Sequence, residues 1–151
     1  VLARYLSPGQ DFKILATDVD SGVLAKAANG VFPEASIREQ VPREYLPTSV
    51  DFGRQDVTGW ARIKPGLKQK ISFKPHNLIE LSYPGDEVFE VVFLRNVLMY
   101  FNPQTIQFVV EKLFKSVRPG GYLFIGRSES LKNIETSWKY ITNSIYRKEA
   151  S

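Results

Sequence analysis

The sequence predicts an α/β protein with a mainly parallel β-sheet flanked by helices. The first observation is that a continuous apolar run begins at residue 91, which is typical of a strand buried on both faces. The second is that a helical pattern and another apolar run, at residues 122–126, follow it. The third is that strand and helix patterns also alternate over residues 12–30. This order is typical of βαβ units.

The helix that follows the 91–94 run has a clear start and a clear stop. Asn102 is a good N-cap, and Pro103 at the first helical position loses no hydrogen bond. Apolar residues then recur at helical spacing: Ile106, Val109, Val110, Leu113, Phe114 and Val117. The Arg-Pro-Gly-Gly sequence at 118–121 is expected to end the helix before the next strand.

The N-terminal strand, residues 12–17, ends in two aspartates. A helix with apolar residues on one face follows, and Gly30 stands behind it. An acidic side chain just past a strand end, here Asp18 or Asp20, can accept hydrogen bonds from two ribose hydroxyls. Either side chain can instead cap the helix, and capping is the preferred interpretation for Asp20.

Polar residues also follow the 91–94 run, namely Arg95, Asn96 and Tyr100. Ligands of open α/β sheets bind beyond the carboxyl ends of the strands. An arginine in so apolar a run is costly to bury unless an anionic or polar group pairs with it. These side chains are therefore expected to serve either a ligand or the protein's own framework.

Composition limits the classes of function. A chain of 151 residues is expected to form one domain. It has no cysteine and one histidine, which excludes thiol catalysis, disulfides and multi-histidine metal sites, so no metal is expected. No apolar run is long enough to cross a bilayer, and no membrane insertion is expected. The absence of cysteine fits a cytoplasmic location.

A basic, irregular segment interrupts the α/β pattern. Alternating pieces at 57–63 and 70–73 predict a small antiparallel β insert over about residues 36–70. Its charge between residues 54 and 74 comes from Arg54, Arg62, Lys64, Lys68, Lys70 and Lys74, against Asp56 alone. An acidic protein partner, a nucleic acid or plain solvent would suit such a face. Few aromatic residues are interleaved, so no nucleic-acid partner is expected.

Two further strands are expected. Residues 71–78 form a strand that ends in polar residues, where Asn77 either reads an adenine edge, with Leu78 packing on the ring, or makes a local turn. Residues 138–147 flank a lone Asn143 and predict one terminal strand with a bend at the edge of the sheet.

Taken together, the motifs resemble a known family. They occur in this order: T-D-V-D at 17–20, H-N-L at 76–78, R-N-V-L-M-Y-F at 95–101, R-P-G-G-Y-L at 118–123 and G-R-S-E at 126–129. This pattern resembles the catalytic domain of the chemotaxis receptor glutamate O-methyltransferases, which use S-adenosylmethionine. The resemblance implies a Rossmann-like class I methyltransferase sheet flanked by helices, with the small β insert.

The resemblance also implies roles for individual residues. It implies that Asp18 binds the ribose hydroxyls of the cofactor and that Asn77 and Leu78 flank the adenine. It also implies that Arg95 and Asn96 line the pocket beside the methionine part. It further implies that Tyr100 faces the transferred methyl group and that Arg95 and Tyr100 are the catalytic residues. The implied product is S-adenosylhomocysteine, and the implied partners are the cytoplasmic helices of methyl-accepting chemotaxis receptors.

The chain departs from the family in one respect. Nothing before Asp18 supplies the first strand and Gly-rich loop of the family, nor its N-terminal helical domain. Residues 1–151 are therefore expected to be a partial catalytic domain, with two strand edges left unpaired. Strand exchange with a second copy or a separate N-terminal segment would complete the sheet. Cofactor binding by these residues alone is expected to be weak or absent.

The implied chemistry suits the residue types. A carboxylate nucleophile is already ionised near neutral pH, so methylation requires alignment and charge neutralisation rather than a general base. Arginine suits the binding of carboxylates because it is always charged and binds them bidentately. Two alternatives stay open, which are a non-catalytic binding module for an acidic protein partner and a methyltransferase for another substrate.

Overall fold

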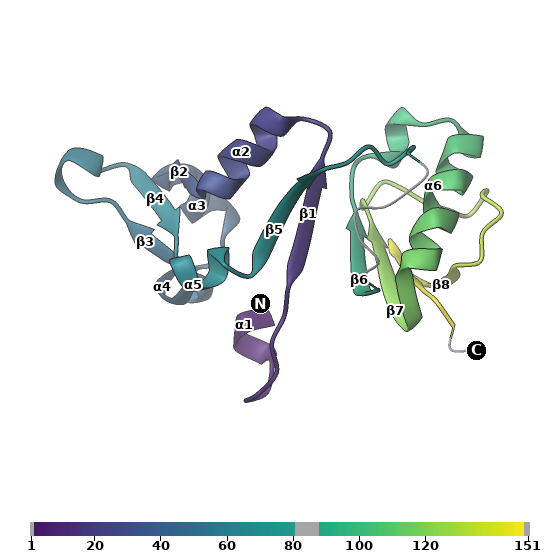
Figure 1. Cartoon of the computed structure of the whole chain (residues 1–151), viewed down its shortest axis with the longest axis horizontal. Helices are drawn as coiled ribbons and strands as arrows, with labels where there is room; N and C mark the ends of the chain where they lie inside the picture. The colour runs from purple at the N-terminus through teal and green to yellow at the C-terminus, as the bar shows by residue number, and fades with distance from the viewer. Residues whose placement is uncertain (1, 81–87, 150–151) are drawn as a thin grey trace. The chain divides into compact units, whose positions relative to one another are not determined.

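The computed structural model describes residues 2–80 and 88–149. The chain divides into two compact units, Val1–Asn77 and Leu78–Ser151, which are taken separately below. Figure 1 labels most of the helices and strands of both units. Among the helices described, none combines the length and the apolar character needed to cross a bilayer.

The first unit contains a pair of parallel strands. β1 (Ile14–Asp18) pairs with β5 (Ile71–Pro75), in a register that aligns Ile14 with Ile71 and Asp18 with Pro75. The backbone N–H of His76 donates to the carbonyl of Asp18 at 2.9 Å, which continues the pairing past the end of β5. The carboxyl ends of both strands therefore lie side by side. A short helix, α1 (Leu2–Tyr5), precedes β1.

Helix α2 (Ser21–Asn29) follows β1 as the sequence predicts, with local signals at both ends. Oδ1 of Asp20 accepts hydrogen bonds from the backbone N–H groups of Gly22 and Val23, which confirms Asp20 as the N-cap. Gly30 ends the helix in the left-handed region at φ 67°, where glycine carries no Cβ penalty. Leu24 is the buried residue of the helix.

The β insert is a three-stranded antiparallel sheet in the order β2-β4-β3. Its strands are β2 (Val31–Pro33), β4 (Trp60–Ile63) and β3 (Val50–Phe52). Short helical segments connect it: α3 (Glu34–Gln40), η1 (Arg43–Tyr45), α4 (Leu46–Ser49), η2 (Gln55–Val57) and α5 (Pro65–Lys68). A small apolar core of Ile37, Leu46, Val50 and Ala61 holds it together.

The insert begins earlier than predicted, and one of the two strand pieces assigned to it belongs to another sheet. Its first strand begins at Val31, before the expected boundary near residue 36. Residues 71–73 do not belong to it, because they form part of β5 and pair in parallel with β1. The alternation of residues 70–73 is compatible with either sheet, so only the pairing partner decides the assignment.

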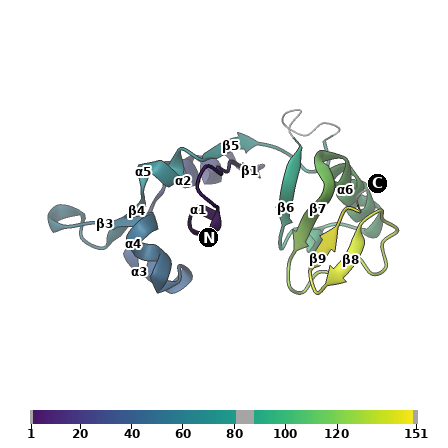
Figure 2. The same ribbon diagram turned by 90° about the horizontal axis from the view of Figure 1, so that it is seen from below.

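The second unit is a mixed four-stranded sheet in the order β6-β7-β9-β8 (Figure 2). β6 (Phe89–Leu94) and β7 (Val117–Ile125) are parallel, and α6 (Pro103–Ser116) connects them. β8 (Lys139–Thr142) and β9 (Ile145–Arg147) form an antiparallel hairpin. The predicted single terminal strand is thus two strands, and β9 lies between β7 and β8 rather than at the edge.

Helix α6 begins as predicted but ends slightly earlier. The Asn102 side chain accepts a hydrogen bond from the backbone N–H of Thr105 at 2.8 Å, and Pro103 stands in the first turn. The helix ends at Ser116, and β7 already begins at Val117, which is buried and pairs with Phe89. The Arg-Pro-Gly-Gly sequence therefore lies inside β7, where the register with β6 is irregular, instead of forming the helix stop.

The core of the second unit lies between α6 and one face of the sheet. Val109 and Val110 of the helix pack against strand residues such as Leu94 and Leu123. The other face of β6 is open, since Val91 is 41% exposed and Phe93 is 69% exposed. The expectation of burial on both faces is therefore wrong for β6. In the described residues, α6 covers only the face to which Leu94 belongs.

The parallel strands β1 and β6 each have an open edge, as do the outer strands β2, β3, β5 and β8. Within residues 2–80 and 88–149, β1 pairs only with β5, and β6 pairs only with β7. This confirms the expected pair of unpaired strand edges. Each edge presents backbone N–H and C=O groups that a further strand would satisfy.

Candidate functional site

Asp18 and Asp20, at the end of β1, have separate roles. Asp20 caps α2, whereas Oδ1 of Asp18 accepts one hydrogen bond, from the backbone N–H of Asp20 at 2.9 Å. Oδ2 of Asp18 forms no hydrogen bond with any residue that the structure describes, and the side chain is half-buried. The carboxylate is therefore held in place by the turn, with acceptor capacity left over for hydroxyl groups.

Asn77 stands beside Asp18 at the same edge of the first unit. It follows β5 after one residue, His76, which is 7% exposed. Because β1 and β5 are adjacent and parallel, Asp18 and Asn77 both leave the pair at its carboxyl end. The structure thus brings these two predicted residues together.

Arg95 lies directly after the last residue of β6 and is exposed. Its guanidinium forms no hydrogen bond or ion pair within residues 2–80 and 88–149. The expected cost of burying this arginine therefore does not arise, because the apolar strand ends at Leu94. The charge is available to an anionic group.

In the rest of this polar segment, exposed side chains stand on both sides of a buried one. Asn96 adopts the left-handed region at φ 59°, which asparagine tolerates better than most residues. Leu98 is 4% exposed and anchors the segment in the core, whereas Tyr100, at the end of η3 (Leu98–Tyr100), is 78% exposed. The predicted residues Arg95, Asn96 and Tyr100 thus share one short segment with a buried anchor between them.

Glu129 contacts the same segment, although its role was not predicted from the sequence. Its carboxylate accepts hydrogen bonds from the backbone N–H groups of Asn96, Leu98 and Gly126. The G-R-S-E motif contains this residue, but nothing in the motif identifies partners that lie so far away in the sequence.

Leu78 differs from the other predicted cofactor residues. Its side chain is half-buried and packs against the core of the second unit. Asn77 belongs to the first unit and Leu78 to the second. The structure therefore groups Asp18 with Asn77, and Arg95 with Asn96 and Tyr100, and it places Leu78 on the core of the latter unit.

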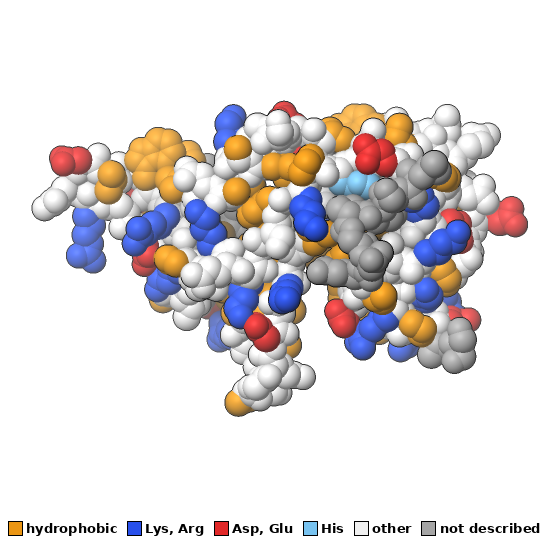
Figure 3. All heavy atoms as spheres, viewed as in Figure 1, with side chains coloured by type: hydrophobic (Ala, Val, Ile, Leu, Met, Phe, Trp, Pro, Cys, Tyr) orange, Lys and Arg blue, Asp and Glu red, His pale blue; other side chains and the backbone are white. Residues whose placement is uncertain are grey.

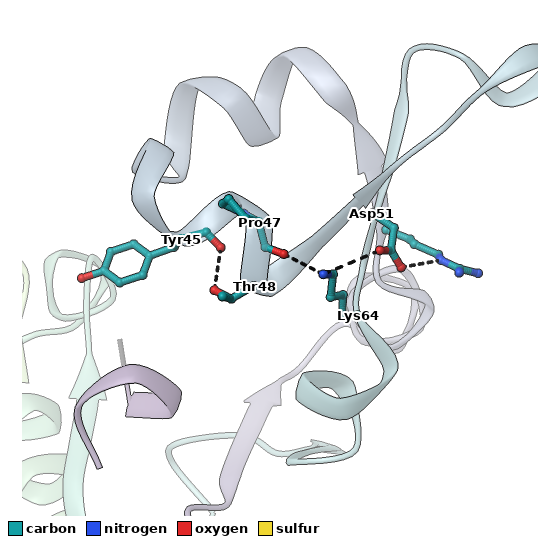
Figure 4. A network of polar contacts seen from close by, with 6 residues as sticks. Tyr45, Pro47, Thr48, Asp51 and Lys64 are labelled. Atoms are coloured by element: carbon teal, nitrogen blue, oxygen red, sulfur yellow. Dashed lines mark hydrogen bonds and ion pairs between the residues drawn. The ribbon is translucent and has the colours of Figure 1, made fainter. Parts of the chain in front are cut away.

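Some of the basic residues of the insert are engaged in ion pairs. Asp51 contacts Arg62 at 3.3 Å and Lys64 at 4.0 Å, and Nζ of Lys64 donates to the carbonyl of Pro47 at 2.6 Å (Figure 4). These contacts give Arg62 and Lys64 a structural role within the insert. The charges of these side chains still face solvent, and exposed pairs of this kind contribute little to stability.

Other residues of the insert remain exposed. Figure 3 shows Lys and Arg side chains, in blue, over the region of β3 and β4. Arg54 is exposed, as are the apolar side chains of Trp60, at 50%, and Val57, at 57%. The part of the chain that the structure describes contains no cluster of three or more His, Cys, Asp or Glu side chains that would hold a metal ion.

Parallel strands with polar residues at their carboxyl ends are the parts of a Rossmann-like methyltransferase sheet. The model of the family described as "CheR methyltransferase, SAM binding domain" matches residues 1–147. The chain therefore belongs to this family. The match confirms the predicted fold class and, through the description of the family, the predicted cofactor S-adenosylmethionine.

Curated relatives agree with the family match. The chain is 34% identical over 139 residues to a chemotaxis protein methyltransferase of Borreliella burgdorferi, covering 90% of this chain and 46% of the relative. It is 29% identical over 140 residues to that of Escherichia coli K12, covering 93% of this chain and 48% of the relative. The chain thus spans about half the length of these relatives.

A solved structure offers a weaker comparison. The S-adenosylmethionine-dependent methyltransferase of Methanosarcina mazei is 21% identical, with a TM-score of 0.39, covering 99% of this chain and 77% of that chain. At this TM-score the comparison adds nothing to the family match.

Proposed function

We propose that this chain supplies part of the catalytic domain of a protein-glutamate O-methyltransferase that modifies chemotaxis receptors. The observation that carries the proposal is the family match over residues 1–147. The substrates are glutamate side chains on cytoplasmic receptor helices, which places the protein in the cytoplasm. The product on the receptor is a glutamyl methyl ester.

The proposed cofactor contacts follow the family resemblance. Asp18 binds the ribose hydroxyls, and Asn77 and Leu78 contact the adenine. The acceptor capacity of Oδ2 of Asp18 supports the first assignment. The position of Asp18 and Asn77 at the carboxyl ends of two adjacent strands supports the second assignment, because adenine and ribose are adjacent parts of one nucleoside.

The residues after β6 are assigned to the reacting end of the cofactor. Arg95 and Asn96 bind the methionine part, and Tyr100 faces the methyl group. The cofactor supplies an electrophilic methyl group on a sulfonium. Arg95, which has no partner in the described residues, neutralises carboxylate charge, and the exposed Tyr100 orients the acceptor carboxylate.

Asn96 carries a second function in this assignment. Its Oδ1 lies so close to Gly126 that a Cβ added there would approach it to 2.6 Å. Its side chain therefore packs against the segment after β7. We assign Asn96 both to cofactor binding and to the close packing of these two segments.

The chemistry needs no general base. The acceptor glutamate is ionised near neutral pH, so the protein must align the oxygen, the methyl carbon and the sulfur in one line. The single histidine, His76, is buried and its backbone N–H extends the β1–β5 pairing, which is a structural role. In this proposal, Arg95 neutralises carboxylate charge and Tyr100 positions the acceptor, and no residue has to remove a proton.

The proposal includes a further strand. The open edges of β1 and β6 each accept a parallel strand, provided by a separate N-terminal segment or by exchange with a second copy. The parallel pairing of β1 with β5 and of β6 with β7 supports this, because sheets of this class are built from parallel strands with both edges of the inner strands paired.

The test is incubation of the gene product that contains this chain with methyl-labelled S-adenosylmethionine and receptor cytoplasmic helices. Label on the receptor that base treatment releases is expected, since methyl esters are base-labile. Asp18→Asn is expected to reduce labelling at low cofactor concentration by about tenfold or more, because charge-assisted hydrogen bonds to the ribose are lost. Asp56→Asn, at an exposed position, is the matched control.

A second candidate function rests on the insert. Exposed Arg54 and Trp60 suit an acidic protein partner, which would make the chain a non-catalytic binding module. Receptor binding without any transfer of label would favour this module. Base-stable label would contradict the formation of glutamyl esters.

A further inference from the structure

The segments that follow β6 and β7 are joined by one carboxylate. β6 and β7 are adjacent and parallel, and Leu94 of the first aligns with Ile125 of the second. Glu129 belongs to the segment after β7, and its carboxylate bonds to backbone groups of the segment after β6. The inference below rests on the proposed function, because that segment carries Arg95, Asn96 and Tyr100.

The hydrogen bonds use both oxygens of the carboxylate. Oε2 of Glu129 accepts from the backbone N–H of Asn96 at 3.0 Å and from that of Gly126 at 2.6 Å, and Oε1 accepts from that of Leu98 at 2.8 Å. The side chain forms no ion pair within the described residues. In the described residues, the groups that stabilise its negative charge are therefore the three backbone N–H groups. Hydrogen bonds from N–H groups to a carboxylate are charge-assisted and strong.

The local backbone holds Glu129 in this position. Its own N–H donates to the carbonyl of Gly126 at 3.0 Å, which closes a tight turn and folds the side chain back over it. The Ser144 hydroxyl donates to the same carbonyl at 2.9 Å, from the turn between β8 and β9. The carboxylate is thus presented by a turn that is fixed on both sides.

The bonds of Glu129 determine the path of the Arg95–Tyr100 segment. One holds Asn96 in its left-handed conformation, and another holds Leu98, the residue buried in the core. Arg95 precedes the first of these anchor points and Tyr100 follows the second. We propose that Glu129 is the positioning residue that fixes this segment in the conformation that presents Arg95 and Tyr100 to the cofactor.

The conservative variant Glu129→Gln tests this role. An amide has one carbonyl oxygen, so it can replace Oε2 or Oε1 but not both. With its oxygen at the Oε2 position, the glutamine keeps the bonds to Asn96 and Gly126 and points its NH₂ group at the N–H of Leu98. Faster hydrogen exchange is therefore expected at Leu98, with a smaller change at Asn96.

The experiment uses the gene product that contains this chain. It measures amide exchange at Asn96 and Leu98, and the affinity for S-adenosylhomocysteine by calorimetry, in the unchanged protein, in Glu129→Gln and in Glu135→Gln. Glu135 is exposed and has no hydrogen bond in the described residues, so its variant removes the same charge without touching the segment. The expected result is about tenfold faster exchange at Leu98 and about tenfold weaker binding in Glu129→Gln only.

A purely structural role of Glu129 would leave the affinity unchanged. A Glu129→Gln protein that binds S-adenosylhomocysteine as tightly as the unchanged protein, or that exchanges Leu98 at the same rate, overturns the inference while the proposed function stands. If the unchanged protein does not bind S-adenosylhomocysteine, the proposed function fails, and the inference fails with it.

Discussion

Gly126 stands where the segments after β6 and β7 come closest. A Cβ at this position would lie 2.6 Å from Oδ1 of Asn96 and 2.6 Å from Oε2 of Glu129. Both atoms belong to groups that take part in the proposed site or its support. The requirement for glycine here comes from this close approach and not from a special backbone conformation, since its φ is not positive.

Gly126→Ala is therefore expected to destabilise the protein by about 1–3 kcal/mol, because the added methyl group separates groups that are in contact. Chemical denaturation measures this change in the free energy of unfolding. Gly66→Ala is the control, since a Cβ there meets nothing within 4 Å and Gly66 lies in α5, where alanine is favoured. Equal stabilities of the two variants would contradict the packing described for Gly126.

Helix α6 is fixed to the rest of its unit by polar contacts as well as by its apolar face. Oε1 of Glu111 accepts from the hydroxyl of Thr136 at 2.6 Å and from the backbone N–H of Ser137 at 2.7 Å. Nε1 of Trp138 donates to the carbonyl of Val110 at 2.8 Å. The segment before β8 is thus held along the helix.

Burial by itself would raise the pKa of Glu111, but the hydrogen bonds from Thr136 and Ser137 lower this pKa overall. The folded-state pKa is then below the unfolded-state value, so Glu111 stabilises the folded state above the unfolded-state pKa. This contribution is lost as the pH falls through the folded-state pKa. Stability should therefore decline as the pH is lowered below about 4.5.

Glu111→Gln tests this contribution. The variant is expected to lose about 1 kcal/mol at pH 7 and to show a smaller decline in the free energy of unfolding below pH 4.5 or so. Thermal or urea unfolding measured across pH 3–7 checks both effects. Glu135→Gln, at an exposed position in the segment before β8, should follow the unchanged protein, and a decline of the same size in Glu111→Gln would contradict the assignment.

At the scale of the whole molecule, the parallel strands β1 and β5 belong to one unit, and β6 and β7 belong to the other. β1 has one open edge in the first unit, and β6 has one in the second, within the described residues. The proposed cofactor residues are divided in the same way, with Asp18 and Asn77 in one unit and Arg95 and Tyr100 in the other. Cofactor binding is therefore expected to depend on a strand that pairs with these edges.

Calorimetric titration of residues 1–151 with S-adenosylhomocysteine checks this dependence. Binding by these residues alone is expected to be weak or absent, with a Kd of roughly 1 mM or above. The gene product that contains the chain is the control and is expected to bind more tightly. Micromolar affinity of residues 1–151 alone would contradict the prediction.

Local features of the fold could be predicted from the sequence. The caps of α2 and α6, by Asp20 and Asn102, depend on hydrogen bonds to residues two or three positions away. The polar residues after β1, β5 and β6 were likewise visible, because strand ends are marked by a change from apolar to polar residues. These features are determined by neighbours in the sequence, so they can be predicted without knowledge of the fold.

Pairing features could not be predicted in this way. The β8–β9 hairpin turns at Asn143 and Ser144, and Ser144 takes φ 63° without the glycine that usually marks such a turn. The assignment of residues 71–73 to β5 depended on the partner strand, and the exposure of Phe93 depended on which elements cover β6.

The sequence by itself therefore determined the class of fold, the family and the residues that stand at the strand ends, because motifs and apolar periodicity are local properties of the chain. Only the tertiary structure decided which strands pair, which faces are covered and which group supports the Arg95–Tyr100 segment. Glu129 illustrates the reason, since it bonds to Asn96 and Leu98 across separations of 33 and 31 residues. Contacts at such separations follow from the pairing of β6 with β7, and no local pattern encodes them.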